Sequence, residues 1–303
     1  MILAAPGNFS YWENIENSCC QVLLIVVRVE RRLIFDRQDF GMLIAQISDT
    51  HITSPGSKAY GVASMAENLR TCVAHINQMV PRPDVVIHSG DVTNAGTVDE
   101  CRYAAEILAG LDMPLYVVPG NHDAGKNLST AFDGGVCPDS DYVVEDYPVR
   151  LIGMDSTRPG QPGGLITAAQ ARWLDEILAG QQNKPTMIFL HHPPVKCSVL
   201  ESDEDGFEGS DLLGEVVEKY ANVERILCGH IHLLVQVRWH GTLVSTAPSI
   251  GMQLGLDLTM QKPSEFLLSA PGYLLHYQTS HGHLVTHAVS LAETKGPYFF
   301  KEH

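Results

Sequence analysis

Short apolar runs alternate with amphipathic segments along most of the chain from Met42 onward. Apolar runs of about four to eight residues are typical of buried strands, whereas apolar residues spaced three and four apart are typical of helices. The runs predict six strands, at residues 42–49, 84–91, 114–120, 150–156, 185–192 and 225–232. Helical spacing predicts helices between them, at residues 65–80, 98–111, 168–180 and 210–221. This alternation indicates an α/β protein built in layers.

The two ends of the chain depart from this rhythm. Beyond residue 232 the pattern changes to hairpins, with turns predicted at His240-Gly241 and His281-Gly282. The first 41 residues show no such alternation, and they are either an extension poorly tied to the fold or, through residues 22–29, an additional edge strand. We therefore expect an N-terminal extension over residues 1–41 and one domain over 42–303, which ends in hairpins at about 233–290.

Composition and charge limit the class of protein. With 303 residues and 45% hydrophobic content, the chain can bury a full core and is typical of a soluble globular protein. Its net charge of -15 disfavours binding to long nucleic acids, because their phosphates would be repelled. The seven cysteines lack C-x-x-C spacing, which favours a reducing cytoplasm. The apolar run at 19–29 is too short to span a bilayer, so we expect no membrane association.

Five short polar motifs follow predicted strands: SDTH, GDVTN, GNHD, LHHPP and CGHIH. Because open α/β sheets bind their ligands at the carboxyl ends of their strands, these motifs should meet at one edge. They supply seven candidate metal ligands: Asp49, His51, Asp91, Asn121, His191, His230 and His232. Carboxylate, amide and imidazole groups without a thiolate favour Mn, Fe, Co or Zn. Seven ligands exceed the roughly four to six that one ion needs, which favours two ions sharing a carboxylate.

The ordered set of motifs resembles the calcineurin-like metallophosphoesterase superfamily, over nearly the whole stretch from Met42 to the C-terminus. The asparagine that ends GDVTN resembles the class III cyclic-nucleotide phosphodiesterase branch. Within that branch, the loop at 48–61 and the segment at 296–302 are most similar to bacterial glycerophosphodiester phosphodiesterases. The resemblance implies two sheets sandwiched between helix layers, a four-layer αββα fold with a C-terminal hairpin extension.

The resemblance also implies roles for individual residues. One ion would be held by Asp49, His51 and His232, and the other by Asn121, His191 and His230. Asp91 would bridge the two ions, which would activate a shared hydroxide for attack on the phosphorus. His122, the histidine of this set that is not a ligand, would contact the phosphate or the leaving oxygen, so Asp91 and His122 are the candidate catalytic residues.

Three positions bear on the substrate. Asn94 is followed by Ala95, whereas the phosphomonoesterases of the superfamily carry Asp and Arg there, and the missing arginine favours a monoanionic diester. Tyr60 matches a substrate-side tyrosine of the glycerophosphodiesterases. Met252 stands where those enzymes carry a histidine, so a glycerophosphodiester and a 3′,5′-cyclic nucleotide both remain candidate substrates. The acidic loop at 201–209 is interpreted as a solvated surface, with selection of a cationic head group as the alternative.

Altogether we predict a dinuclear-metal-dependent phosphodiesterase that hydrolyses small phosphodiesters and forms a homo-oligomer of two or more copies. One alternative is a non-catalytic scaffold subunit on the same fold, although none of its candidate ligands is missing. The other alternative is a nuclease or phosphomonoesterase of the same superfamily, which the acidic charge and Ala95 disfavour.

Overall fold

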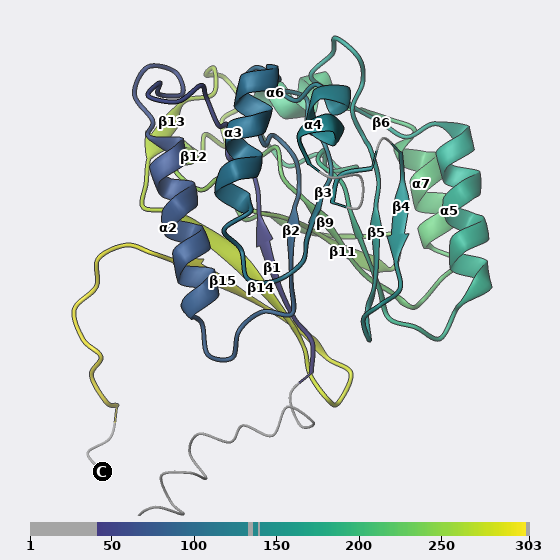
Figure 1. Ribbon diagram of the computed structural model, residues 1–303. Helices are drawn as coiled ribbons and strands as arrows, with labels where there is room; N and C mark the ends of the chain where they lie inside the picture. The colour runs from purple at the N-terminus through teal and green to yellow at the C-terminus, as the bar shows by residue number, and fades with distance from the viewer. Residues whose placement is uncertain (1–40, 133–135, 139, 301–303) are drawn as a thin grey trace, which may run out of the picture. The chain divides into compact units, whose positions relative to one another are not determined.

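The structure, a computed structural model, describes residues 41–132, 136–138 and 140–300 (Figure 1). Residues 1–40 lie outside this range, so both interpretations of the N-terminal segment stay predictions. Residues from Met42 onward form the unit described below. No helix among the described residues combines the length and the apolar character needed to cross a bilayer.

The first sheet begins with the first predicted strand. It contains β1 (Leu43–Ile47), β2 (Val85–His88), β3 (Leu115–Val117), β14 (Gly272–Gln278) and β15 (Leu284–Ser290), in the spatial order β15-β14-β1-β2-β3. The strands β1, β2 and β3 are parallel, and β14 joins β1 in the antiparallel direction. All residues of β1 and β2 are buried, because both faces of these strands are covered.

The second sheet comes from the middle of the chain. It contains β4 (Tyr142–Val144), β5 (Arg150–Gly153), β7 (Thr186–Phe189), β9 (Val223–Cys228), β10 (Gln236–Trp239) and β11 (Thr242–Thr246), in the order β10-β11-β9-β7-β5-β4. Its four central strands are parallel, and the two edge strands are antiparallel to their neighbours. The carboxyl ends of β5, β7 and β9 therefore meet at one edge.

Four layers result from the way the helices and sheets pack. Helices α2 (Met65–Gln78) and α3 (Val98–Leu108) share an apolar cluster with the first sheet, and α5 (Ala168–Gly180) and α7 (Ser210–Val217) share another with the second. A third cluster fills the space between the sheets, with Ile44 and Ile87 from the first and Met187 and Phe189 from the second. The predicted αββα fold is thus confirmed.

Local sequence explains where several elements begin and turn. Thr97 and Glu100 form a reciprocal capping box at the start of α3, and Thr167 and Gln170 form another at the start of α5. The hairpin between β10 and β11 turns at the predicted position, where His240 and Gly241 both have positive φ (43° and 83°). Two consecutive positive φ values match the twist of a tight hairpin.

Seven short elements have no counterpart in the sequence prediction: α4 (Gly125–Ala131), α6 (Leu200–Asp205), β4 (Tyr142–Val144), β6 (Gly164–Leu165), β8 (Phe207–Glu208), β12 (Met252–Leu254) and β13 (Phe266–Leu268). Each is shorter than the stretch of sequence over which helical or strand periodicity can be recognised. Three of them, α6 and the paired strands β12 and β13, nevertheless supply residues to the pocket described next.

Candidate metal centre and substrate pocket

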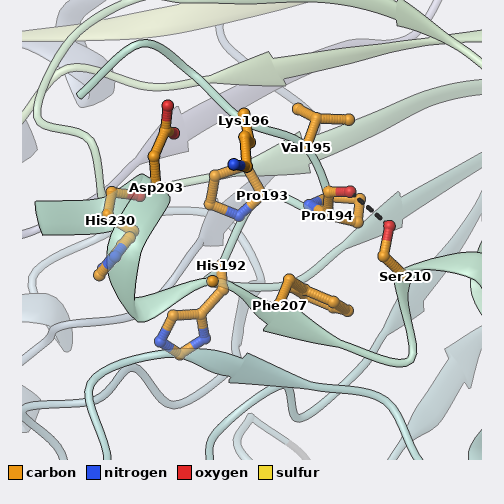
Figure 2. Close-up of a pocket in the computed structure, with 11 residues that line it drawn as sticks. His192, Pro193, Pro194, Val195, Lys196, Asp203, Phe207, Ser210 and His230 are labelled. Atoms are coloured by element: carbon orange, nitrogen blue, oxygen red, sulfur yellow. Dashed lines mark hydrogen bonds between the residues drawn. The ribbon is translucent and has the colours of Figure 1, made fainter. Parts of the chain in front are cut away.

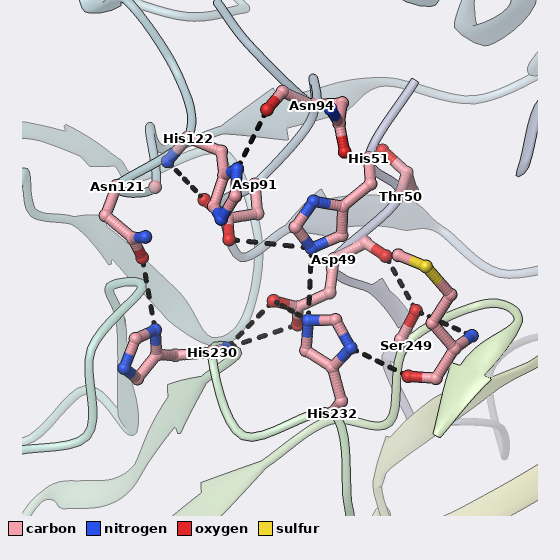
Figure 3. Close-up of polar contacts among 12 residues, drawn as sticks. Asp49, Thr50, His51, Asp91, Asn94, Asn121, His122, His230, His232 and Ser249 are labelled. Atoms are coloured by element: carbon pink, nitrogen blue, oxygen red, sulfur yellow. Dashed lines mark hydrogen bonds and ion pairs between the residues drawn. The ribbon is translucent and has the colours of Figure 1, made fainter. Parts of the chain in front are cut away.

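The polar motifs follow the carboxyl ends of five strands, as predicted, and Figure 3 shows side chains from four of these motifs. The motifs after β1, β2 and β3 come from the first sheet, and those after β7 and β9 come from the second. All seven candidate ligands meet there, and His191 and both carboxylates are almost fully buried. The site therefore lies where the two sheets come together.

The backbone at this edge has an unusual conformation. Five of the seven candidate ligands have φ between 40° and 70°: Asp49, His51, Asp91, His230 and His232. A side chain in this left-handed region costs about 1–2 kcal/mol, and such residues persist when the surrounding structure holds them. The glycine at position 120 leaves room for the carboxylate of Asp91, because a Cβ atom on Gly120 would lie 2.2 Å from Oδ1 of Asp91.

One group of candidate ligands surrounds the end of β1. Nε2 of His51 lies 3.0 Å from Nε2 of His232 and 3.6 Å from Oδ2 of Asp91. Nε2 of His232 also lies 3.4 Å from Oδ1 of Asp49. These atoms all carry lone pairs when the imidazoles are neutral and have their proton on Nδ1, so a cation among them would satisfy all of them together.

A second group lies beside the first. Oδ1 of Asn121 is 3.1 Å from Nε2 of His191 and 3.1 Å from Nδ1 of His230. Nε2 of His191 lies 3.4 Å from Oδ2 of Asp91, the same oxygen that faces His51. Asp91 therefore reaches both groups, as a bridging carboxylate must. The donor types and their convergence fit two divalent ions.

Backbone carbonyls orient two of the imidazoles. Nδ1 of His191 lies 2.8 Å from the carbonyl oxygen of Ser89, and Nδ1 of His232 lies 2.7 Å from that of Met252. Because a carbonyl oxygen only accepts hydrogen bonds, Nδ1 carries the proton in both rings. Nε2 is then left to face the centre, which is the arrangement typical of metal-binding histidines.

Burial and charge set the protonation of the metal-free centre. Burial lowers the pKa of His51 well below its ordinary value and that of His230 to about 3, so both rings are neutral. For Asp91, burial alone would raise the pKa, but the charge of His191 and its hydrogen bond hold it well below the ordinary range. The same pairing overcomes burial and raises the pKa of His191 to about 9. At neutral pH the ring of His191 therefore carries a proton that a bound metal ion would displace.

The GNHD loop divides its polar side chains among different contacts. Nδ1 of His122 donates to the carbonyl oxygen of Asn94 at 2.8 Å, and the backbone N–H of His122 donates to Oδ1 of Asp91 at 2.8 Å. The carboxylate of Asp123 accepts hydrogen bonds from three backbone N–H groups and the hydroxyl of Thr93. Asp123 thus secures the turn, and Nε2 of His122 makes no hydrogen bond among the described residues.

A pocket of about 540 Å³ opens above the centre. Asn121, His122, His230 and His232 lie in its wall, together with the predicted Tyr60. Asn94 does not line it, although Oδ1 of Asn94 is buried without a hydrogen-bond partner among the described residues. Tyr60 is 58% exposed, and its ring centroid lies 5.4 Å from that of Phe266.

Several pocket residues were missed by the sequence prediction. Phe266 and Leu254 come from the short β12–β13 pair, and no local pattern pointed to them. Glu201 and Asp205 belong to the loop interpreted as a solvated surface, yet both line this pocket. The only sign of their role in the sequence was the cluster of acidic residues that follows His191.

A second cavity, of about 270 Å³, lies beside His230 and is lined by His192, Phe207 and Lys196 (Figure 2). Nδ1 of His192 lies 3.0 Å from the hydroxyl of Ser156. A ring nitrogen of His192 also comes within 4.8 Å of the candidate ligand atoms of His191 and His230.

Known proteins resemble this chain in sequence and in fold. The family described as "Calcineurin-like phosphoesterase" matches residues 42–234. The chain is 36% identical over 264 residues to a "Probable glycerophosphodiester phosphodiesterase" of Arcobacter nitrofigilis, which covers 86% of this chain and 97% of the relative. It is 28% identical over 258 residues to a 3′,5′-cyclic adenosine monophosphate phosphodiesterase of Escherichia coli K12, covering 83% and 90% of the two chains.

Among solved structures, a dimetal phosphatase from Danio rerio superposes with a TM-score of 0.57 at 16% identity. The superposition covers 84% of this chain and 100% of that structure. At this level of identity the likeness supports the fold alone.

Proposed function

Because the chain belongs to the calcineurin-like phosphoesterase family, we propose that it hydrolyses small phosphodiesters at a dinuclear divalent metal centre. The observation that carries the proposal is the position of Oδ2 of Asp91. This oxygen faces His51 on one side and His191 on the other, at 3.6 and 3.4 Å. One carboxylate thereby joins the two groups of candidate ligands into a single centre.

The candidate ligands divide between two ions in the proposed centre. The first ion is assigned to Asp49, His51 and His232, the second to Asn121, His191 and His230, and Asp91 to both. When bound, such a pair of ions activates water as a nucleophile and neutralises the charge of the phosphoryl oxygens. The all-nitrogen-and-oxygen donor set supports Fe, Mn, Co or Zn as the metals.

His122 is assigned the proton transfer or hydrogen bond to the leaving oxygen. Its Nδ1–H is held by the carbonyl of Asn94, so the ring has a fixed orientation while Nε2 stays free. In its doubly protonated form, Nε2 can donate to the alkoxide that leaves the phosphorus. The carboxamide of Asn94 is assigned a hydrogen bond to a phosphoryl oxygen, and Tyr60 is assigned a contact with the alcohol.

The substrate class follows from the pocket and the relatives. The two relatives described above are named for a glycerophosphodiester and a cyclic nucleotide, both of which are small phosphodiesters. A pocket of about 540 Å³ accommodates a substrate of this size. The net charge of -15 supports a small substrate over a long nucleic acid, whose many phosphates would be repelled.

The organisation of the protein is part of the proposal. We assign residues 42–303 to one metallophosphoesterase domain, whose hairpins at about 233–290 help to form the pocket and a subunit interface in a homo-oligomer. The exposed Leu267 and Leu268 of β13 support such an interface. Four of the described cysteines, Cys72, Cys101, Cys197 and Cys228, are free thiols, which supports the cytoplasm as the compartment.

The test is a metal titration combined with a substrate panel. Purified protein is loaded with Mn, Fe, Co or Zn, and bound metal is measured alongside hydrolysis of bis(p-nitrophenyl) phosphate, glycerophosphodiesters, cyclic nucleotides and phosphomonoesters. We expect two ions per chain and diester hydrolysis that exceeds monoester hydrolysis. Fewer than one ion per chain after loading, with no diester cleaved, would establish the scaffold alternative instead.

A further inference from the structure

Polar side chains interrupt the apolar space between the two sheets. Side chains alternate along a strand, and Ile44 of β1 belongs to the apolar cluster between the sheets, so Gln46 faces the same space. Gln46 is fully buried, as are Ser89, which follows β2, and His276 of β14. Burying an unpaired polar group is unfavourable, so such groups persist in a core when they are hydrogen-bonded. The carboxamide of Gln46 must therefore have partners between the sheets.

These partners belong to both sheets. Nε2 of Gln46 donates to Oγ of Ser89 at 2.9 Å and to the carbonyl oxygen of Cys228, at the end of β9, at 3.0 Å. Oε1 of Gln46 lies 2.9 Å from Nε2 of His276. Because the carbonyl of Cys228 can only accept a hydrogen bond, the amide nitrogen has to lie on that side. Oε1 is then left to accept from His276, which fixes the orientation of the carboxamide.

His276 connects this carboxamide to a second crossing between the sheets. Burial, together with the charge of Arg225, lowers the pKa of His276 to about 3, so its ring is neutral. Nε2 carries the proton that Gln46 accepts, and Nδ1 accepts from the hydroxyl of Thr286 at 2.8 Å. Arg225 of β9 donates to the same hydroxyl. A continuous chain of hydrogen bonds therefore runs from Arg225 to the carboxamide.

The two acceptors of the carboxamide lie beside the candidate metal centre. Ser89 precedes the bridging carboxylate by two positions, and its carbonyl oxygen accepts from Nδ1 of His191 at 2.8 Å. Cys228 precedes His230 by two positions. A single side chain, that of Gln46, thus holds the residue that orients one histidine and the residue from which the loop to the other begins.

We infer that Gln46 is a positioning residue for the second ion of the proposed metal centre. Through Ser89 it fixes the carbonyl oxygen that orients His191, and through Cys228 it fixes the start of the loop that carries His230. Both histidines are assigned to the second ion. The inference rests on the proposed dinuclear centre, and it gives Gln46 a role there without direct contact with an ion.

The ligands assigned to the first ion depend less on this network. In the described part of the chain, the rings of His51 and His232 make no hydrogen bond to the carboxamide or to its two acceptors. The link toward Asp49 is indirect, since it runs from the hydroxyl of Ser89 to that of Ser48, 2.8 Å away. Loss of the carboxamide should therefore weaken the second ion selectively, whereas a general loss of stability would weaken both.

The test measures the affinity of each ion by calorimetry with Mn²⁺. Gln46→Met keeps a side chain of similar length and removes the hydrogen bonds, so the second ion should bind about 10–100-fold more weakly. The affinity of the first ion should stay within about threefold of the wild type, because its ligands keep their own contacts. Asn121→Ala, which removes a ligand of the second ion alone, identifies the affinity that belongs to the first. Ser89→Ala is a milder variant that should weaken the second ion about fivefold, the equivalent of one hydrogen bond.

Thr186→Val is the matched control. Thr186 is buried at the start of β7, and its hydroxyl accepts from Nε of Arg150 at 3.0 Å and donates to the carbonyl of Lys184 at 3.0 Å. The control should lower the midpoint of urea unfolding of the metal-free protein, as Gln46→Met does, and leave both affinities unchanged.

The possible outcomes separate the inference from the function on which it rests. Equal weakening of both ions in Gln46→Met, no weakening at all, or a weakened second ion in the Thr186→Val control would overturn the inference. If Gln46→Met does not fold, Ser89→Ala decides by the same criterion. A wild-type protein that binds fewer than two ions would instead contradict the proposed dinuclear centre.

Discussion

Replacing His122 by alanine should lower turnover while both metal ions are retained. The ring of His122 is held by the carbonyl of Asn94, and its Nδ1 is 2.8 Å from that oxygen. Among the described residues, the side chain of His122 makes no hydrogen bond to any of the seven candidate ligands. Loss of a positioned proton donor should reduce kcat by about 10²–10³-fold. The ion count should stay at two, because the ligand set is complete without this ring.

The structure also gives the loss of stability expected for the His122→Ala variant. The substitution removes one hydrogen bond, worth about 1 kcal/mol, and the edge contact with His51, whose ring centroid is 4.7 Å away. Such ring contacts contribute about 0.5–1.5 kcal/mol. The free energy of unfolding should therefore fall by about 2 kcal/mol, which leaves the protein folded at room temperature and its activity measurable.

The assay measures kcat with bis(p-nitrophenyl) phosphate, bound metal by mass spectrometry and unfolding by circular dichroism. His122→Asn is a useful second variant, because its amide can still donate to Asn94 but offers nothing at the position of Nε2. It should be as slow as the alanine variant and more stable. Loss of an ion together with activity would refute the reasoning and make His122 a ligand, a role that its grouping with His51 and Asp91 permits geometrically.

Four further results are expected. Metal binding at neutral pH should release about one proton per chain, measured by calorimetry in two buffers, because His191, with its pKa of about 9, must lose a proton to bind an ion. The raised pKa also means that the His191–Asp91 pair stabilises the metal-free protein at neutral pH and that this contribution is lost as pH rises through about 9. Gly120→Ala should abolish binding of both ions, because its Cβ would displace Asp91, whereas Gly125→Ala, which has open space around it, should retain them in the same metal assay. Chelation should lower the melting temperature, since each ion at a hundredfold excess over its Kd contributes about 3 kcal/mol, and an unchanged melting curve would contradict binding at this centre.

The prediction that the polar motifs meet at one edge has a physical reason. Parallel strands in one sheet end at the same edge, so a polar residue that follows each apolar run has to meet the others there. The prediction also made the strands too long: the run at 185–192 is a strand only over Thr186–Phe189. The left-handed backbone of residues such as Asp91 ends the pairing between strands. The spacing of apolar residues gives no indication of that conformation. Family membership and the αββα layers are confirmed.

The pocket walls could not be predicted in the same way. Helix α6 has six residues and no buried side chain, so it lacks an apolar period that would reveal it. Its position depends on the hydrogen bonds of Glu201 with Ser264, a pair that is distant in the sequence. Contacts of this kind form only in the completed fold. A run of acidic residues by itself is equally typical of a solvated loop.

The distribution of the candidate ligands along the chain has a consequence for biosynthesis. His51 and His232, whose ring nitrogens face each other, are 181 positions apart. During synthesis at about 5–20 residues per second, the first ligand emerges roughly ten seconds or more before the last. The first sheet also needs β14, which follows every candidate ligand, to cover β1. Binding of both proposed ions therefore requires that the two sheets have already met, which makes metal uptake a late event in the folding of a newly made chain.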